Sequence, residues 1–334
     1  MAKTAVVILN WNGRKLLERY LPSVIKFSNQ AEVIIADNAS TDDSVQWLKT
    51  NYPSLQIVIN NSNGGYAGGY NQALKKIEAD YFVLLNSDVE VTENWLQPLL
   101  DLMQGNDKIA ACQPKLLWDT DREKFEYAGA SGGFIDKYGY PFCRGRLFDE
   151  LEKDSGQYES TTECFWASGA CMMVRAHLYH QYGGLDEDFF AHMEEIDLCW
   201  RFKNSGYSIF VCPQSVVYHY GGGTLSQQNA HKTFLNFRNG LILLMKNLPV
   251  HFVFYNIPLR IFLDLLAALK FLSDGKREDF KAILSANWHF IIGIRKWWRK
   301  RHGFHHKFMT GVYDGSIVWN YFVKKKKKFS DLKF

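Results

Sequence analysis

The sequence has neither a disulfide framework nor a cysteine metal site. Its six cysteines, at 112, 143, 164, 171, 199 and 212, include no CxxC pair and no spacing typical of metal ligands. Most of them lie among apolar residues, so we expect buried, reduced thiols, as in a cytosolic protein. The apolar run near the N-terminus has only five residues, 5–9, after one lysine. This run is too short for a secretory signal peptide.

Long uncharged runs and two common nucleotide-binding motifs are also missing. The longest charge-free segments in the C-terminal part are 247–259 and 282–294, of thirteen residues each. A helix needs about 20 residues to cross a bilayer, so we expect a soluble or peripheral protein. The glycine-rich segment 60–71 matches neither GxGxxG nor the Walker pattern, which argues against a dehydrogenase and a P-loop ATPase.

The composition is that of a globular protein, but its charge is unevenly distributed. Hydrophobic residues make up 47% of the 334 positions and charged residues 22%, enough for one large domain or a domain with an appendage. Residues 1–233 carry 20 Lys/Arg against 29 Asp/Glu, and residues 234–334 carry 19 against 6. A basic C-terminal region on an acidic body indicates an anionic partner, either membrane lipid or nucleic acid.

The first ninety residues alternate between buried strands and amphipathic helices. Apolar runs at 5–9, 32–36, 55–59 and 81–85 predict four strands, and helical patterns separate them. This alternation predicts an α/β fold with a doubly wound parallel sheet. Ligands of such sheets lie at the carboxyl ends of the strands.

Three polar segments follow these strands, and each has two interpretations. Asp88, in the triplet 86–88, can hold a hard divalent cation against phosphate oxygens or belong to an ordinary turn. Asp37 can bind the base or ribose of a nucleotide or cap a helix or turn. The glycine-rich segment 60–71 can bring backbone amides to phosphate or sugar, or form a long surface turn.

The second half contains a further set of candidate residues. Segment 118–160 is polar, glycine-rich and irregular, which suggests a surface insertion or a substrate loop. An exposed Trp166 is expected to introduce another buried strand. The carboxylates at 194, 195 and 197 predict the first turn of an amphipathic helix, where they can serve in catalysis or only complement the helix dipole. His219, expected at a strand end, is a candidate metal ligand beside Asp88.

Seven segments in this order resemble glycosyltransferase family 2, and its rhamnosyltransferase-like bacterial branch in particular. The resemblance covers about residues 4–240. It implies the GT-A fold, here a doubly wound mixed sheet flanked by helices, and inverting transfer from a nucleotide-diphosphate sugar with Mg²⁺ or Mn²⁺. The segments are VVILNWNG, IIADNASTDDS, NNSNGGYAGGYNQAL, FVLLNSDVEV, FWASGACMMVRA, GGLDEDFFAHMEEIDLCWR and VVYHYGGGT.

The resemblance also implies roles for individual residues. Asp88 and His219 would hold the metal, although Asn86 replaces the first Asp of the family's DxD motif. The family's catalytic base is the Asp of a Glu-Asp pair; the pair here is Glu194-Glu195, and Glu195 is the first choice and Glu194 the second. Asp197 is expected to be structural. The acceptor side would include Trp166, Gly169, Ala170 and Asp186. The nucleotide and donor sugar would be bound by Asn10, Asp37, Asn38, Ser40, Asn63, Gly65, Gly68, Asn71 and Asn86.

We expect a catalytic domain at 1–233, with a nucleotide-sugar half at about 1–115 and an acceptor half at about 116–233. Residues 234–334 are expected to form a basic, amphipathic helical region. Its tryptophans 288, 297 and 298 lie among Lys and Arg, and five lysines follow at 324–328. This combination favours peripheral attachment to the cytoplasmic face of the cell membrane. The alternative is a helical region that packs on the catalytic domain and ends in a solvated lysine segment.

The expected function is sugar transfer in cell-surface polysaccharide synthesis, with dTDP-rhamnose as the first guess for the donor. The acceptor would be a glycan, or a glycan carried on a polyprenyl diphosphate. One alternative is a non-catalytic sugar-nucleotide-binding protein of the same fold, which the departures at Asn86 and Glu195 would suit. Another is a nucleic-acid-binding protein, against which the apolar, Trp-rich character of the C-terminal region argues.

Overall fold

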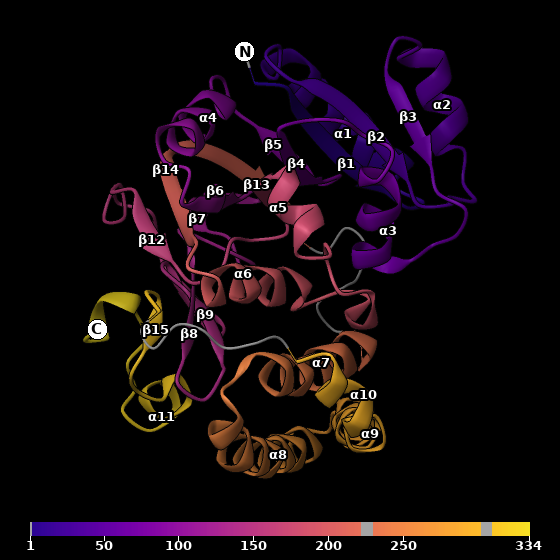
Figure 1. Cartoon of the computed structure of the whole chain (residues 1–334). Helices are drawn as coiled ribbons and strands as arrows, with labels where there is room; N and C mark the ends of the chain where they lie inside the picture. The colour runs from indigo at the N-terminus through magenta and orange to yellow at the C-terminus, as the bar shows by residue number, and fades with distance from the viewer. Residues whose placement is uncertain (1, 222–229, 302–308) are drawn as a thin grey trace.

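The computed structural model describes residues 2–221, 230–301 and 309–334 (Figure 1). Its first four strands are parallel neighbours in the order β4-β1-β2-β3, as the alternating pattern predicts. Helices α1, α2 and α3 connect them. The bounds are β1 (Thr4–Asn10), α1 (Arg14–Phe27), β2 (Glu32–Asp37), α2 (Ser44–Asn51), β3 (Gln56–Ile59), α3 (Gly65–Leu74) and β4 (Tyr81–Asn86).

Antiparallel strands extend this sheet on the β4 side, which makes it the mixed sheet expected from the resemblance. Strand β13 pairs antiparallel with β4, and β14 pairs parallel with β6 but antiparallel with β5. The main path of this ten-stranded sheet is β12-β14-β6-β13-β4-β1-β2-β3, and β5 pairs with β14 and β7 with β6 beside this path. The bounds are β5 (Val89–Val91), α4 (Leu96–Gly105), β6 (Ile109–Trp118), β7 (Asp121–Phe125), β12 (Thr162–Cys164), β13 (Cys171–Arg175), α5 (Ala176–Gln181), η1 (Glu187–Phe189), α6 (Glu194–Asn204) and β14 (Ser208–His219).

The prediction that segment 118–160 is irregular is wrong where it forms the short strands β7 to β11. Its interpretation as a substrate loop stays a prediction. A second, five-stranded sheet has the order β11-β10-β9-β8-β15, and β15 comes from near the C-terminus. Its strands are so short that the glycines between them hide the alternating pattern, and one partner is distant in sequence. The bounds are β8 (Gly133–Asp136), β9 (Pro141–Cys143), β10 (Arg146–Leu147), β11 (Glu150–Leu151) and β15 (Val312–Tyr313).

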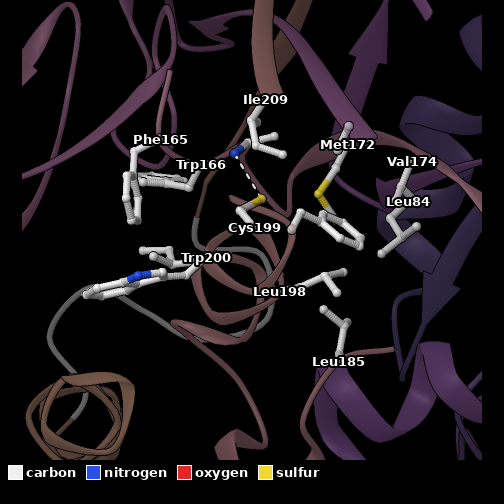
Figure 2. Close-up of a cluster of buried hydrophobic side chains, with 14 of the residues drawn as sticks. Leu84, Phe165, Trp166, Met172, Val174, Leu185, Leu198, Cys199, Trp200 and Ile209 are labelled. Carbon is white, nitrogen blue, oxygen red and sulfur yellow. Dashed lines mark hydrogen bonds between the residues drawn. The ribbon is translucent and has the colours of Figure 1, made fainter. Parts of the chain in front are cut away.

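A buried apolar cluster between the large sheet and α6 fixes the position of that helix (Figure 2). Leu198 of α6 lies fully buried in it, and Cys199 accepts a hydrogen bond from the backbone amide of Ala167. Trp166 belongs to the same cluster and is buried, so the expectation of an exposed Trp166 is wrong. Its indole N–H donates to the carbonyl of Phe134 in β8, a partner that the local sequence does not reveal.

The C-terminal region is helical, as expected, and it also packs on the body of the protein. Helix α7 starts before the expected domain boundary at 233 and contacts α6, α8 and α9. After α10 the chain returns to add β15 to the second sheet. Figure 1 shows α7 to α10 together at one end of the molecule, beyond α6. The bounds are α7 (Ala230–Asn247), α8 (Val250–Ser273), α9 (Arg277–Ile292), α10 (Ile294–Arg299), α11 (Ile317–Phe322) and η2 (Phe329–Asp331).

Two details of this region differ from the sequence-based expectations. Trp297 is buried, whereas Trp288 and Trp298 are exposed. Helix α8 has 24 residues and a mean hydropathy of 1.7 over its most apolar 18, so by length and composition it could cross a membrane. The search for charge-free segments did not identify α8, because Arg260 and Asp264 interrupt its apolar sequence. In the structure these two residues pair with each other inside the protein.

Candidate active site

A pocket of about 450 Å³ opens at the carboxyl ends of the central strands. It lies where β1 and β4 end, and its other sides are closed by the segments that follow β7, precede β13 and α6, and follow β14. Ten of the residues predicted from the sequence line it together, although they come from widely separated segments. They are Asn38, Asn63, Gly65, Asn86, Asp88, Gly169, Ala170, Glu194, Glu195 and His219.

Asp88 and His219 face each other in this pocket. The antiparallel pairing of β5 with β14 places His219 opposite Val89, and the backbone amide of Tyr220 donates to the carbonyl of Asp88. The imidazole Nε2 therefore lies 3.2 Å from a carboxylate oxygen of Asp88. The expected position of His219 at a strand end is confirmed.

Glu126 completes this arrangement and was not anticipated from the sequence. Its carboxylate lies 3.1 Å from Nδ1 of His219, and both side chains are buried. Burial would lower the pKa of His219, but the charges of Asp88 and Glu126 raise it well above its usual value. Glu126 follows β7 in a segment without a recognisable pattern, so only the folded chain reveals its partner.

The chemistry of this group fits a hard divalent cation. Two ligands of an octahedral Mg²⁺ or Mn²⁺ lie about 3 Å apart when each bond is about 2.1 Å long, close to the 3.2 Å between His219 and Asp88. Among the described residues, no group of three or more His, Cys, Asp or Glu side chains could hold a metal ion. Such a cation would therefore need further oxygen ligands, such as those of a diphosphate.

The residues expected around the nucleotide base form a network at the ends of β1 and β2. Asp37 accepts hydrogen bonds from the side chain of Asn10, at 3.0 Å, and from the backbone amide of Ser40. The Ser40 hydroxyl in turn accepts from Asn10 and from the amide of Asn12. Asn10, Asp37 and Ser40 lie behind the pocket wall, whereas Asn38 lines it and donates to Asn63.

The glycine-rich segment 60–71 was expected to be a loop. Instead, from Gly65 onward it forms the first turns of α3. Gly65 has a φ of +68°, and a Cβ there would lie 2.5 Å from the carbonyl oxygen of Phe190. This close approach explains the glycine despite the low helix propensity of glycine. Gly68 faces Glu187 outside the pocket. Asn71 is bonded to the backbone of Leu185 and to Glu187, so its side chain ties α3 to η1.

Glu194 and Glu195 occupy the first turn of α6, as predicted, and both line the pocket. Burial raises the pKa of both carboxyls, that of Glu195 to about 7, and the charge of Glu195 raises the pKa of Glu194 further. One oxygen of each carboxylate is buried without a hydrogen-bond partner among the described residues. Such groups are suited to taking a proton near neutral pH.

The segment before α6 has a strained backbone. Phe190, His192 and Met193 have φ values of 65°, 69° and 76°, in the left-handed region that costs non-glycine residues about 1–3 kcal/mol each. Asn239 of α7 holds this segment, because its amide group donates to the carbonyls of Phe189, Ala191 and His192 at 2.8–3.0 Å. A residue of the C-terminal region therefore positions the start of the helix that carries the two glutamates.

The residues expected on the acceptor side are separated in the structure. Gly169 and Ala170 line the pocket, and the carbonyl of Gly169 accepts from the hydroxyl of Tyr66. Trp166 lies in the core, as described above. Asp186 lies outside the pocket; burial would raise its pKa, but ion pairs with Lys246 and Lys300 hold it well below its usual range.

Three more pocket residues were not predicted. His192 is partly buried, and its buried Nε2 lacks a partner among the described residues; desolvation, with the nearby positive charges, lowers its pKa to about 4. His231 and Lys232 reach the pocket from the start of α7, and burial and the charge of Arg146 lower the pKa of Lys232. Of these three residues, His192 lies within the quoted segment GGLDEDFFAHMEEIDLCWR, so its position could have indicated a role.

Comparison with known proteins gives one family and several relatives. Residues 5–183 match the family described as Glycosyl transferase family 2, a range that ends before Glu194, Glu195 and His219. N-acetylglucosaminyl-diphospho-decaprenol L-rhamnosyltransferase of Mycobacterium tuberculosis is 26% identical over 244 residues, which cover 68% of this chain and 79% of that protein.

Two solved structures share the fold at low sequence identity. GalNAc-T7 with UDP, GalNAc and Mn²⁺ has a TM-score of 0.56 and 16% identity, over 73% of this chain and 48% of that one. Mannosyltransferase PcManGT from Pyrobaculum calidifontis, in complex with GDP-Man and Mn²⁺, has a TM-score of 0.51 and 13% identity, over 90% of this chain and 84% of that one. The similarity supports the GT-A-like architecture.

Proposed function

The chain belongs to glycosyl transferase family 2, and from this we propose that it is an inverting, metal-dependent transferase that uses a nucleotide-diphosphate sugar. One observation carries the proposal: the pair Asp88–His219 lines the same pocket as Glu194 and Glu195, whose carboxylates each keep one oxygen without a hydrogen-bond partner among the described residues. The first pair suits a cation on a diphosphate, and the second suits proton removal from an acceptor hydroxyl.

The donor is proposed to lie along the ends of β1, β2 and β4. Asp88 and His219 would hold Mg²⁺ or Mn²⁺, which stabilises negative charge on the departing diphosphate. Asn38, Asn63, Gly65 and Asn86 would contact the nucleotide and sugar. The network of Asn10, Asp37 and Ser40 would hold the wall against which the base lies, while Gly68 and Asn71 act through the position of α3. Asn38 lines the pocket, so it is the first candidate for a direct contact with the base.

The proposed chemical step is a single displacement. The acceptor oxygen forms a bond to the anomeric carbon as the bond from that carbon to the diphosphate oxygen breaks. Glu195 takes the proton of the acceptor hydroxyl, with Glu194 as the second choice. The diphosphate leaves with the electron pair of the broken bond, so no general acid is required. Attack from the face opposite the leaving group inverts the anomeric configuration.

The first candidate for the donor is dTDP-rhamnose, and the first candidate for the acceptor is a glycan on a polyprenyl diphosphate. The support is the similarity to the mycobacterial rhamnosyltransferase, whose name states such an acceptor. Gly169, Ala170 and the start of α7 would face the acceptor, and Trp166 and Asp186 would support that side from behind. We place the enzyme on the cytoplasmic side of the membrane, with residues 1–233 as the catalytic part and 234–334 as its basic helical region.

The direct test is transfer by the purified full chain. A panel of nucleotide sugars, including dTDP-rhamnose, is incubated with Mn²⁺ or Mg²⁺ and a polyprenyl-diphosphate-linked acceptor. Mass spectrometry should show one added sugar, and NMR of the product should show an anomeric configuration opposite to that of the donor. Retention of configuration would contradict the inverting step. Tight binding of a nucleotide sugar with no transfer to any acceptor would support the non-catalytic alternative.

A further inference from the structure

Helix α8 exposes most of its large apolar side chains, unlike a surface helix of a soluble protein. Its buried side contains the polar residues Asn256, Arg260 and Asp264 beside Val253, Ile257 and Ala268. Phe254 is 68% exposed and Tyr255 is 75% exposed. A helix in water buries its apolar side, so this orientation indicates an apolar environment on the outer side of α8.

The neighbouring helices extend the same surface. Helix α9 packs against both α7 and α8, and α10 follows it. Trp288 and Ile292 of α9 and Trp298 of α10 are exposed. We call this surface the apolar face of α8–α10; its main members are Phe254, Phe262, Leu269, Trp288, Ile292 and Trp298. Large apolar side chains exposed on helices that pack against one another mark an interaction site.

The charges around this face are mostly positive. Residues 250–300 contain nine Lys/Arg and four Asp/Glu. Arg277, Arg295 and Arg299 are exposed and make no ion pair among the described residues. Exposed Trp next to unpaired Arg is the composition of a helix that lies in the interface of an anionic bilayer.

We propose that the apolar face of α8–α10 docks onto an anionic lipid bilayer, with α8 lying in the interface. The docking itself does not depend on the proposed function. Only the suggestion that docking serves a lipid-linked acceptor rests on it. A bilayer supplies apolar contact to the exposed side chains and negative charge to the arginines. A second copy of the chain would bring the same positive charges together, which disfavours it as the occupant.

The buried side of α8 argues for lying in the interface rather than crossing the membrane. Nε of Arg260 lies 3.0 Å from Asp264, and the guanidinium stacks on the ring of Tyr140 at 3.8 Å. Crossing would take this charged pair away from Tyr140 and into the hydrocarbon, where charged side chains are costly. Docking leaves the pair in place and covers only the outer side of the helix.

The docked surface is connected to the active site through side-chain contacts. Lys296 of α10 and Lys300, directly after it, form ion pairs with Asp188 of η1, and Lys300 also pairs with Asp186, directly before η1. Helix α7 holds the strained segment before α6 through Asn239. A bilayer bound at α8–α10 therefore lies against the elements that position the pocket, where a lipid-linked acceptor would arrive.

Vesicle flotation tests the proposal on the purified full chain, without donor or acceptor. The vesicles are phosphatidylcholine alone, or equal parts of phosphatidylcholine and phosphatidylglycerol. The test variant replaces Phe262 and Leu269, 56% and 58% exposed, with Glu; its control replaces Trp319 and Val323, 55% and 52% exposed on and after α11, with Glu. Thermal unfolding confirms that both variants fold. A third variant, R295E/R299E, tests the charge contribution.

We expect the chain to float with the anionic vesicles, and added salt to reduce this. F262E/L269E should lower the bound fraction at least tenfold, while the control binds like the wild type. R295E/R299E should lose binding to anionic vesicles and leave binding to neutral ones unchanged. Equal binding by test and control variants, or no flotation of the wild type, would overturn the proposal. So would a dimer in sedimentation that F262E/L269E dissociates. A failure of sugar transfer would leave the flotation result unaffected.

Discussion

The carboxylate of Glu126 lies 3.1 Å from Nδ1 of His219, on the side of the imidazole opposite Asp88. A carboxylate in this position fixes the ring orientation of a metal-binding histidine and makes its other nitrogen a better ligand. Glu126 also accepts a hydrogen bond from the backbone amide of Ala128, which limits its own movement. We therefore propose that Glu126 is a positioning residue for His219.

Glu126→Gln should weaken Mn²⁺ binding. The amide keeps the shape but loses the charge, and loss of such a partner costs about 10- to 100-fold in metal affinity. Calorimetry of Mn²⁺ binding with a nucleoside diphosphate present measures this without turnover. Glu152→Gln is the matched control, because Glu152 is also buried but bonds to Tyr158 and Phe329 away from the pocket. Unchanged Mn²⁺ affinity in Glu126→Gln would remove the proposed role.

Asn239→Ala should lower activity and stability together. It leaves the three carbonyls of Phe189, Ala191 and His192 without their shared donor, at a cost of about 1–3 kcal/mol in unfolding free energy. The strained segment would then relax and displace Glu194 and Glu195, which lowers kcat. Asn287→Ala is the control, since Asn287 is buried in α9 and, within the part of the chain that the structure describes, donates only to Ile283. A comparable loss of kcat in the control would mean that Asn239 acts through stability alone.

The pH dependence of transfer should follow the ionisation of Glu195. Burial raises the pKa of this carboxyl to about 7, and a base must be ionised to accept a proton. The rate should therefore fall about tenfold per pH unit below 7 and level off above it. Glu195→Gln should lower kcat by about 10²–10⁴-fold and abolish this dependence. If Glu194→Gln does so instead, the role belongs to Glu194.

Stability should show the opposite trend with pH. A carboxyl whose pKa is raised on folding is most favourable while protonated, so the stability it contributes is lost as pH rises through the raised pKa. Burial raises the pKa of Glu194, and Glu194→Gln should therefore raise Tm at pH 8 while changing it little at pH 4. Thermal unfolding at the two pH values measures this. A variant that is less stable at pH 8 would show that the charged form of Glu194 is stabilised by contacts.

Much of the fold followed from local patterns. Apolar runs that end in polar residues predict β1 to β4, and Asp88 could therefore be located after β4. Acidic residues ahead of an amphipathic pattern predict α6, and Glu195 could be located in its first turn. The position of His219 beside Asp88 could be suspected from its strand end. Its actual contact depends on the pairing of β14 with β5, between residues more than a hundred positions apart.

The remaining features depend on long-range contacts. The start of α3 requires a glycine at position 65 because Phe190 approaches it closely, and β15 completes the sheet formed by β8 to β11. Trp166 is buried because β8 offers a carbonyl to its indole. Glu126 and Asn239 are isolated polar residues whose roles arise only when distant segments meet. None of these contacts leaves a periodic or local signal in the sequence.

Metal-dependent nucleotide binding tests the central claim most directly. Calorimetry with a panel of nucleoside diphosphates, with and without Mn²⁺, compares the wild type with Asp88→Asn, whose folding is checked by thermal unfolding. We predict that one nucleotide binds the wild type, that removal of Mn²⁺ weakens it at least tenfold, and that Asp88→Asn abolishes the effect of Mn²⁺. Nucleotide binding that neither Mn²⁺ nor the substitution changes would contradict a cation site at Asp88 and His219.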